Sequence, residues 1–240
     1  MKPYLSKPFK YFLAATLGLG VFVQFGGPIW RPVKDRMLGA KTVGQVTRAL
    51  ETEMREKFPN LNELTDGRAL AMLGFKEERS LELWKHREGG WELVRSYPFT
   101  GVCGTLGPKL REGDLQIPEG AYEVVSLNPN SSYHLSMEIN YPNEFDRKMA
   151  SREGRENLGF AIFIHGSDAT VGCIPVGDEN IEEIFYLIAK NGFRKTEVLI
   201  FPRDFRKGKP PPEIEGIDWE SELYSKLADR AKRFPIGLGE

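Results

Sequence analysis

The chain has 240 residues, of which 40% are hydrophobic and 28% are charged. This composition excludes an intrinsically disordered protein, and at roughly 150 residues per domain it allows one domain with appendages or two small domains. The 33 Lys and Arg residues against 34 Asp and Glu residues give a net charge of −1, so no basic excess indicates a nucleic-acid partner. Two cysteines and three histidines, without close spacing, exclude a structural zinc site and a disulfide-rich scaffold.

The N-terminus has the pattern of an export signal. Three lysines within the first ten residues precede an apolar run at residues 11–25, which fits the hydrophobic core of a signal peptide. Continued to Trp30, the run is long enough to span a bilayer, and no Ala-x-Ala cleavage site follows. We therefore expect residues 1–30 to form a signal anchor, held in the inner membrane through residues 11–30. A cleaved signal peptide and a buried core helix are the alternatives. The lysines would stay in the cytoplasm, which places the rest of the chain in the periplasm or an equivalent extracytoplasmic compartment.

Hydrophobic periodicity predicts a β-rich body with helices at its edges. Residues 42–58 carry apolar side chains at helical spacing, whereas from Ala69 onward the period changes to two. The chain is therefore expected to be mainly β with peripheral helices, α+β overall. The predicted elements are a hairpin at 81–97, strands at 120–125, 134–139, 160–164 and 196–201, helices at 178–191 and 219–234, and a Pro-rich linker at 207–212. The expected boundaries are an N-terminal helical segment at 31–68, a β-rich domain at 69–204, and a linker with a C-terminal helix at 205–240.

One histidine and one cysteine lie at a spacing that suits nucleophilic catalysis. The strand at 160–164 leads directly into His165, and Cys173 follows eight positions later, directly after Gly172. A free thiol is only a few per cent thiolate at neutral pH, and a neighbouring imidazole can take its proton and stabilise the thiolate as an ion pair. Gly172 would let the backbone turn so that its N–H and that of Cys173 face a developing oxyanion.

Structural interpretations of the same residues stay open on spacing alone. A cysteine in a strand pattern is commonly a small buried residue, and an isolated histidine is commonly a structural one. A Cys103–Cys173 disulfide is a further alternative in an exported protein. Motifs for dinucleotides, for the phosphates of nucleotides and for serine hydrolases are absent from the sequence, so no cofactor is expected. His86 and His134 lack a partner at ligand spacing, so no metal is expected either.

The motif His165-Gly, followed by Thr170-Val-Gly-Cys173-Ile, resembles the signature of the L,D-transpeptidase catalytic domain of YkuD type. It is most similar to the YafK-like murein L,D-transpeptidase subfamily, in which these two elements lie close together. Upstream, residues 106–120, 128–133 and 140–147 match segments of that subfamily in the correct order. The similarity covers about residues 70–204. It implies that the β-rich domain is the catalytic domain, with the β-sandwich or barrel fold of L,D-transpeptidases.

The resemblance also implies a mechanism. Cys173 would be the nucleophile and His165 the general base and later acid, while the Gly172 N–H would bind the oxyanion. A backbone carbonyl of Gly166 or Ser167 would orient the histidine, with the Asp168 carboxylate as the less favoured orienter. The implied donor is a peptidoglycan stem tetrapeptide. Attack on the diaminopimelate carbonyl would expel D-alanine and leave a thioester, which an amine converts into a cross-link and water hydrolyses.

Substrate contacts are predicted for four residues that lie in family motifs. They are Thr170, Arg111, Arg147 and Tyr141, and Lys109 is a further candidate for a carboxylate partner. Two departures weaken the transfer of substrate contacts from the widespread branch of the family: Val171 replaces a histidine, and Pro175 stands where an arginine is usual. Two other functions stay open: a hydrolase or amidase that detaches peptides or a wall-linked lipoprotein from peptidoglycan, and a non-catalytic cell-wall binding domain.

Overall fold

A computed structural model describes residues 39–236 of the chain. The chain divides into two compact units, residues 1–41 and residues 42–240, and all elements named below belong to the second unit. The predicted signal anchor at residues 1–30 lies outside the described residues. Within residues 39–236, no helix combines the length and the apolar character needed to cross a membrane.

Eight strands form one mixed sheet in the order β3-β2-β1-β8-β4-β5-β6-β7. The neighbouring pairs β1–β8 and β6–β7 are parallel, and all other neighbours are antiparallel. The strands are β1 (Leu70–Phe75), β2 (Ser80–Arg87), β3 (Gly90–Pro98), β4 (Gly120–Ser131), β5 (His134–Ile139), β6 (Phe163–His165), β7 (Ile174–Pro175) and β8 (Thr196–Phe201). With the helices around this sheet, the predicted mainly β, α+β class is confirmed.

Strand β4 connects the two halves of the sheet. Its first part, Gly120 to Glu123, pairs with β8, and its later part pairs with β5 after a bulge between Val124 and Ser126. A bulge bends a strand and increases its twist, so β4 turns the chain from one half to the other. The half that contains β5, β6 and β7 carries both His165 and Cys173.

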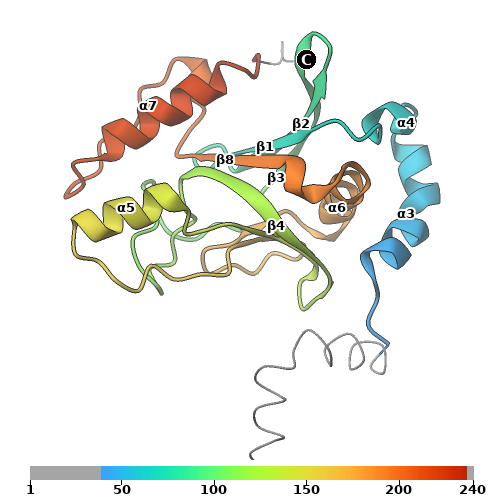
Figure 1. Ribbon diagram of the computed structural model, residues 1–240, viewed down its shortest axis with the longest axis horizontal. Helices are drawn as coiled ribbons and strands as arrows, with labels where there is room; N and C mark the ends of the chain where they lie inside the picture. The colour runs from blue at the N-terminus through green and yellow to red at the C-terminus, as the bar shows by residue number, and fades with distance from the viewer. Residues whose placement is uncertain (1–38, 237–240) are drawn as a thin grey trace, which may run out of the picture. The chain divides into compact units, whose positions relative to one another are not determined.

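Helices cover both faces of the sheet (Figure 1). On one face, α3 and α6 pack side by side, and their apolar residues join one core with alternate residues of β1 such as Leu70 and Met72. On the other face, α7 packs on Leu73 and Phe75 of the same strand, because successive side chains of a strand point to opposite faces. The helices are α3 (Val43–Lys57), α4 (Leu61–Leu64), α5 (Glu144–Arg152), α6 (Asp178–Asn191) and α7 (Glu220–Ala231), and short 3-10 turns lie at Phe193–Lys195 and Phe205–Lys207.

Most of the predicted elements are present. The helix predicted at 42–58 is α3, which begins with a capping box between Thr42 and Gln45. The hairpin, the strand at 196–201 and the last helix are confirmed as β2–β3, β8 and α7. The strand predicted at 160–164 is displaced, because only residues 163–165 pair with a neighbour. Helix α5 was not predicted; its short sequence carries mostly polar residues and little apolar periodicity.

The Asp146 carboxyl in the first turn of α5 is buried and gives the fold a pH-dependent term. Burial raises its pKa to about 6, although the Asn143 N–H donates to it at 2.9 Å. Because the folded state holds this proton more tightly than the unfolded chain, its stabilising contribution is full below pH ~4 and is lost as pH rises towards 6. We expect Asp146→Asn to remove this dependence. The stability of the variant relative to the wild type should therefore be about 2 kcal/mol higher at pH 7 than at pH 4.

Urea denaturation of the wild type and the variant at both pH values measures this difference. Asp229→Asn, an exposed carboxylate of α7 in an ion pair with Lys232, is the matched control for the loss of a charge. Equal pH dependence in the wild type and Asp146→Asn would contradict the assignment.

Candidate active site

The pairing of two short parallel strands brings the segments of the predicted nucleophile and the predicted base together. β6 ends at His165, and β7 begins directly after Cys173. The pairing of Ile164 with Ile174 continues one residue back, which places Cys173 beside Phe163. Phe163 and His165 share a face because they are alternate residues of one strand. Cys173 therefore lies next to β6 close to its end at His165, and its thiol is directed at the backbone of that strand.

The imidazole of His165 is buried and held in one orientation. Its Nδ1–H donates to the carbonyl of Gly166 at 2.5 Å, so Nε2 is left as the acceptor. Tyr133, from the turn between β4 and β5, lies against the ring with the centroids 4.6 Å apart. Burial lowers the pKa of His165, and the hydrogen bond to Gly166 opposes this. The orienting carbonyl is thus that of Gly166, one of the two that we expected.

The thiol of Cys173 is partly buried and contacts the backbone of the segment before β6. It accepts from the Phe163 N–H at 3.4 Å and lies 3.9 Å from the Ala161 carbonyl. Burial raises its pKa, while the Phe163 N–H and the charge of Lys109 lower it. Among the described residues, no hydrogen bond joins the thiol to His165. With the pKa of the thiol raised and that of the imidazole lowered, both groups are neutral near pH 7, which favours a neutral pair over the ion pair considered above.

A neutral pair predicts a particular pH dependence of the reaction. We expect kcat/KM to fall on the acid side at a lower pH than an ordinary imidazole would give, because burial lowers the pKa of His165. It should stay level well into the alkaline range, because burial raises the pKa of Cys173. Alkylation by iodoacetamide should instead rise steadily through this plateau, because only the thiolate reacts with this reagent. Stopped-flow alkylation and steady-state kinetics over pH 5–10 measure the two profiles. Constant, fast alkylation down to pH 5 would show a preformed thiolate and contradict the neutral pair.

Thr170 stabilises the loop that precedes Cys173. Its hydroxyl donates to the Cys173 carbonyl at 2.7 Å and accepts from the Gly172 N–H at 3.3 Å. A hydroxyl used in this way supports the nucleophile from within the loop. A direct contact between Thr170 and substrate stays a prediction.

The position of Gly172 allows no other residue without strain. Its φ is +122°, and a Cβ atom there would lie 3.0 Å from the carbonyl oxygen of Gln116. The backbone beside the nucleophile is thus packed against the loop of residues 105–116. This close approach is the structural reason for glycine directly before Cys173.

The second cysteine lies close to the same loop. Cys103 Sγ is 3.7 Å from the Thr170 hydroxyl, and both cysteines are free thiols. The disulfide considered above is therefore not formed in this structure. Within residues 39–236, no group of three or more His, Cys, Asp or Glu side chains is arranged to hold a metal ion.

An acidic residue in the first turn of α6 supports the turn after His165. Asp178 Oδ1 accepts from the Ser167 N–H at 2.7 Å, and it lies so close to Gly166 that a Cβ there would clash at 2.5 Å. The cap of α6 is Gly177, without a side-chain hydrogen bond. Asp168, the less favoured orienter, is bonded to the Ser167 hydroxyl at 3.4 Å.

The loop of residues 105–116 is held together by one carboxylate. Asp114 accepts from the backbone N–H groups of Leu110, Arg111 and Gln116, and it forms an ion pair with Lys109 at 2.5 Å. Lys109 is buried, so its ammonium is used within the loop and is not available to a substrate carboxylate. Arg111, in contrast, is exposed, and its guanidinium has no hydrogen bond or ion pair to the described residues.

The remaining two predicted residues lie apart from the thiol. Tyr141 is 5% exposed, and its hydroxyl donates to the carbonyls of Leu158 and Lys109 at 2.9 and 3.4 Å, so it supports the two segments that flank the site. Arg147 lies on α5, where it lines a separate hollow together with Arg155. Contacts of either residue with substrate stay predictions.

Sequence reasoning did not assign Asp178 to the site, and it covered Tyr133 only through the family-like segment at residues 128–133. Both reach it through tertiary contacts across strands and turns that a linear motif does not reveal. The usable signal was weak: an aromatic residue in a polar hairpin turn, and an acidic residue directly after glycine at a helix start.

Comparison with known proteins places this site in a family. The profile of the L,D-transpeptidase catalytic domain, YkuD, matches residues 76–200, which are more than half of the chain. YafK of Escherichia coli strain K12 is 36% identical over 133 residues, which are 53% of this chain and 52% of that protein. YafK of Escherichia coli O157:H7 matches with the same values. This chain therefore spans about half the length of the curated relatives it matches.

Solved structures are less similar. The helical cell shape determining protein Pgp2 from Campylobacter jejuni is 18% identical with a TM-score of 0.47, and the match covers 69% of this chain and 70% of that chain. L,D-transpeptidase 1 of Mycobacterium tuberculosis is 14% identical with a TM-score of 0.33, covering 55% of this chain and 62% of that chain. At these sequence identities and TM-scores, the solved structures support no conclusion beyond the match with the family profile.

Proposed function

Since the chain belongs to the L,D-transpeptidase catalytic domain family, we propose that it is an exported cysteine acyltransferase acting on peptidoglycan stem peptides. The observations that support this proposal are the pairing of β6 with β7, which brings the segments of His165 and Cys173 together, and the bond to Gly166, which leaves Nε2 of the imidazole as the acceptor. A histidine held in one tautomer at the end of the strand next to the thiol suits a general base.

The proposed reaction has two steps. Nε2 of His165 takes the thiol proton as Sγ of Cys173 attacks the diaminopimelate carbonyl of the donor, and the protonated imidazole then gives the proton to the leaving D-alanine amine. The resulting thioester is attacked by an amine or by water. His165 removes the proton of that nucleophile, the C–S bond breaks, and the thiol is restored.

Negative charge on the carbonyl oxygen develops beside a glycine turn. In this proposal the backbone N–H groups of Gly172 and Cys173 bind the oxyanion, and a donor of this kind is worth about 10²–10³ in kcat. The Gly172 N–H donates to the Thr170 hydroxyl in a bond of 3.3 Å, which an oxyanion can replace at small cost.

A muropeptide assay tests this function and separates transfer from hydrolysis. Wild-type full-length chain is incubated with a disaccharide tetrapeptide donor, with and without a tripeptide acceptor, and the products are identified by mass spectrometry. Cross-linked dimers support transfer, and loss of D-alanine in water alone supports hydrolysis. Release of a lipoprotein from a wall-linked substrate would support the detaching function. Unchanged donors under all of these conditions would contradict catalysis and leave the wall-binding alternative.

The proposed compartment is extracytoplasmic, with residues 1–30 as an inner-membrane anchor. The support is the lysine-flanked apolar run in the sequence. Alkaline phosphatase fused to the C-terminus of the full chain is expected to be active, because this enzyme needs the oxidising compartment outside the cytoplasm. Activity of a C-terminal fluorescent reporter that folds only in the cytoplasm would contradict export.

A further inference from the structure

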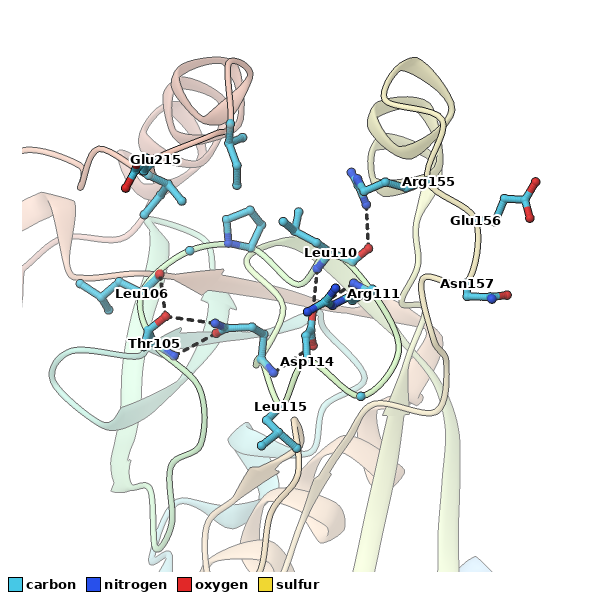
Figure 2. A pocket seen from close by; sticks show the side chains of 16 residues that line it. Thr105, Leu106, Leu110, Arg111, Asp114, Leu115, Arg155, Glu156, Asn157 and Glu215 are labelled. Carbon is cyan, nitrogen blue, oxygen red and sulfur yellow. Dashed lines mark hydrogen bonds between the residues drawn. The ribbon is translucent and has the colours of Figure 1, made fainter.

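A cavity of about 770 Å³ lies beside the candidate active site (Figure 2). One wall is the loop of residues 105–116, called the cavity loop below. The second wall is the segment Arg155 to Asn157 after α5. The third wall comes from residues 214–217 before α7, called the strap, which contributes Ile214, Glu215 and Ile217. The strap lies beyond residue 200, where the match with the family profile ends.

Two of the segments that line the cavity also lead to the surroundings of Cys173. Gln116 of the cavity loop faces the cavity, and its carbonyl oxygen is the atom that a Cβ on Gly172 would meet at 3.0 Å. On the other side, the Asn157 carbonyl accepts from the N–H of Glu112 at 2.8 Å, and four residues later Ala161 contacts the thiol. A ligand in the cavity therefore lies next to the loop that carries the nucleophile.

Charged residues of both signs line the cavity, namely Arg111 and Arg155 together with Asp114, Glu156 and Glu215. Figure 2 shows Arg111 and Arg155 directed into the space between the walls, whereas the side chain of Glu156 points away from it. Glu215 lies across the cavity on the strap, turned away from Arg111. The Asp114 carboxylate is already used by the bonds that hold the cavity loop.

Of the two arginines, Arg111 is free for a ligand. Arg155 donates to the Leu110 carbonyl at 2.8 Å and pairs with Glu153 at 2.5 Å. The Arg111 guanidinium makes no such bond within residues 39–236. A planar guanidinium matches a carboxylate with two parallel hydrogen bonds, so this lining suits a carboxylate group.

Buried hydrogen bonds hold the cavity loop to the sheet and to α7. The buried pair Lys76 and Glu119 binds the ends of the cavity loop: Lys76 Nζ donates to the carbonyls of Gly107 and Ile117, and Glu119 accepts the Gly107 N–H. The Tyr224 hydroxyl of α7 donates to the same Glu119 at 2.7 Å, which joins the helix after the strap to the loop. A site held in this way loses little ordering entropy on binding.

We propose that this cavity is a subsite for a carboxylate of a wall peptide, bound by the Arg111 guanidinium between the cavity loop and the strap. The inference rests on the proposed function, because it is that function which makes peptides with free carboxylates the ligands. The carboxylate belongs either to the acyl donor or to the amine acceptor. The C-terminal segment would then be part of the substrate site and not only a cover for the sheet.

Direct binding tests the subsite without catalysis. Full-length Cys173→Ala protein is titrated with the tripeptide L-Ala-γ-D-Glu-diaminopimelate and with its analogue in which the diaminopimelate carboxyls are amides, using calorimetry. In the Cys173→Ala background, Arg111→Gln is expected to raise Kd for the tripeptide about tenfold or more and to change Kd for the diamide little. The Kd of Arg111→Lys for the tripeptide should lie between those of the parent and Arg111→Gln, because lysine keeps the charge but loses the two parallel hydrogen bonds of a guanidinium. Arg48→Gln, an exposed arginine on α3, is the matched control.

Kinetics of the active protein identify the peptide that supplies the carboxylate. If Arg111→Gln raises KM for the donor when water is the only acceptor, the carboxylate belongs to the donor. If the variant loses activity only in transfer to the peptide acceptor, the carboxylate belongs to the acceptor. Equal Kd of Arg111→Gln and the parent for the tripeptide, in protein whose thermal unfolding is unchanged, would overturn the subsite. This outcome is distinct from failure of the proposed function, in which the wild type leaves every donor unchanged whether or not it binds.

Discussion

Replacing Cys173 by alanine is expected to lower the rate of donor conversion by more than about 10³-fold, because it removes the sulfur that would form the thioester. The substitution removes one sulfur from a partly buried position and leaves its 2.7 Å bond from Thr170 to the backbone in place. The protein should therefore fold and still bind peptides. Mass spectrometry of the products gives the rate, and a stable mass increase of the wild type with a carbapenem gives the reactivity of the thiol.

Cys103 offers the matched control. It is the only other cysteine in the sequence, it is a free thiol, and it lies near the same loop. Cys103→Ala is expected to keep most of the activity and the carbapenem adduct. If Cys173→Ala keeps its activity while Cys103→Ala loses it, the assignment of the nucleophile is wrong.

Replacing Lys76 by methionine is expected to destabilise the protein by about 3–5 kcal/mol, because it leaves the buried carboxylate of Glu119 without its counter-charge. The two groups are 2.9 Å apart, and both side chains are almost fully buried. Burial lowers the pKa of Lys76, and the charge of Glu119 opposes this. The ammonium also satisfies the carbonyls of Gly107 and Ile117, which would lose their donor.

Urea denaturation measures the loss of stability, and a double variant shows whether the unpaired charge of Glu119 causes it. Lys76→Met combined with Glu119→Gln removes both charges, so it should be more stable than Lys76→Met alone by at least about 1 kcal/mol. Lys226→Met, which breaks an exposed pair with Glu222 on α7, should cost less than about 1 kcal/mol. A Lys76→Met protein as stable as the wild type would show that the pair does not hold the cavity loop.

Local sequence patterns were sufficient for the elements that have strong periodicity or a clear end signal. The capped helix α3, the hairpin β2–β3 and strand β8 are close to where the pattern predicts them. Helix α5 escaped prediction, since its stability comes from its capping box and from packing of Met149 and Ala150, not from a continuous apolar stripe. Strand β6 was placed too early, because pairing with β5 begins only at Phe163.

The roles of the charged residues could not be read from the motifs that contain them. Lys109 and Arg111 are two residues apart, and each was a candidate for a substrate carboxylate. The ammonium of Lys109 is buried against Asp114, whereas the Arg111 guanidinium lies at the cavity. Which of the two is free depends on the turn that Asp114 forms, and that turn is set by packing of the loop on the sheet.

The sequence by itself determined the family and the candidate pair: His165 and Cys173 at a spacing of eight, with a glycine before the thiol, within a motif that resembles the family signature. Only the tertiary structure decided how the pair is presented. The parallel pairing of β6 with β7 brings their segments together, the Gly166 carbonyl selects the tautomer, and burial raises the pKa of the thiol and lowers that of the imidazole. Only the tertiary structure, too, brought the strap and α7 next to the cavity loop. The physical reason is that reactivity depends on local residue types, whereas orientation, burial and cavity walls depend on contacts between segments far apart in the chain.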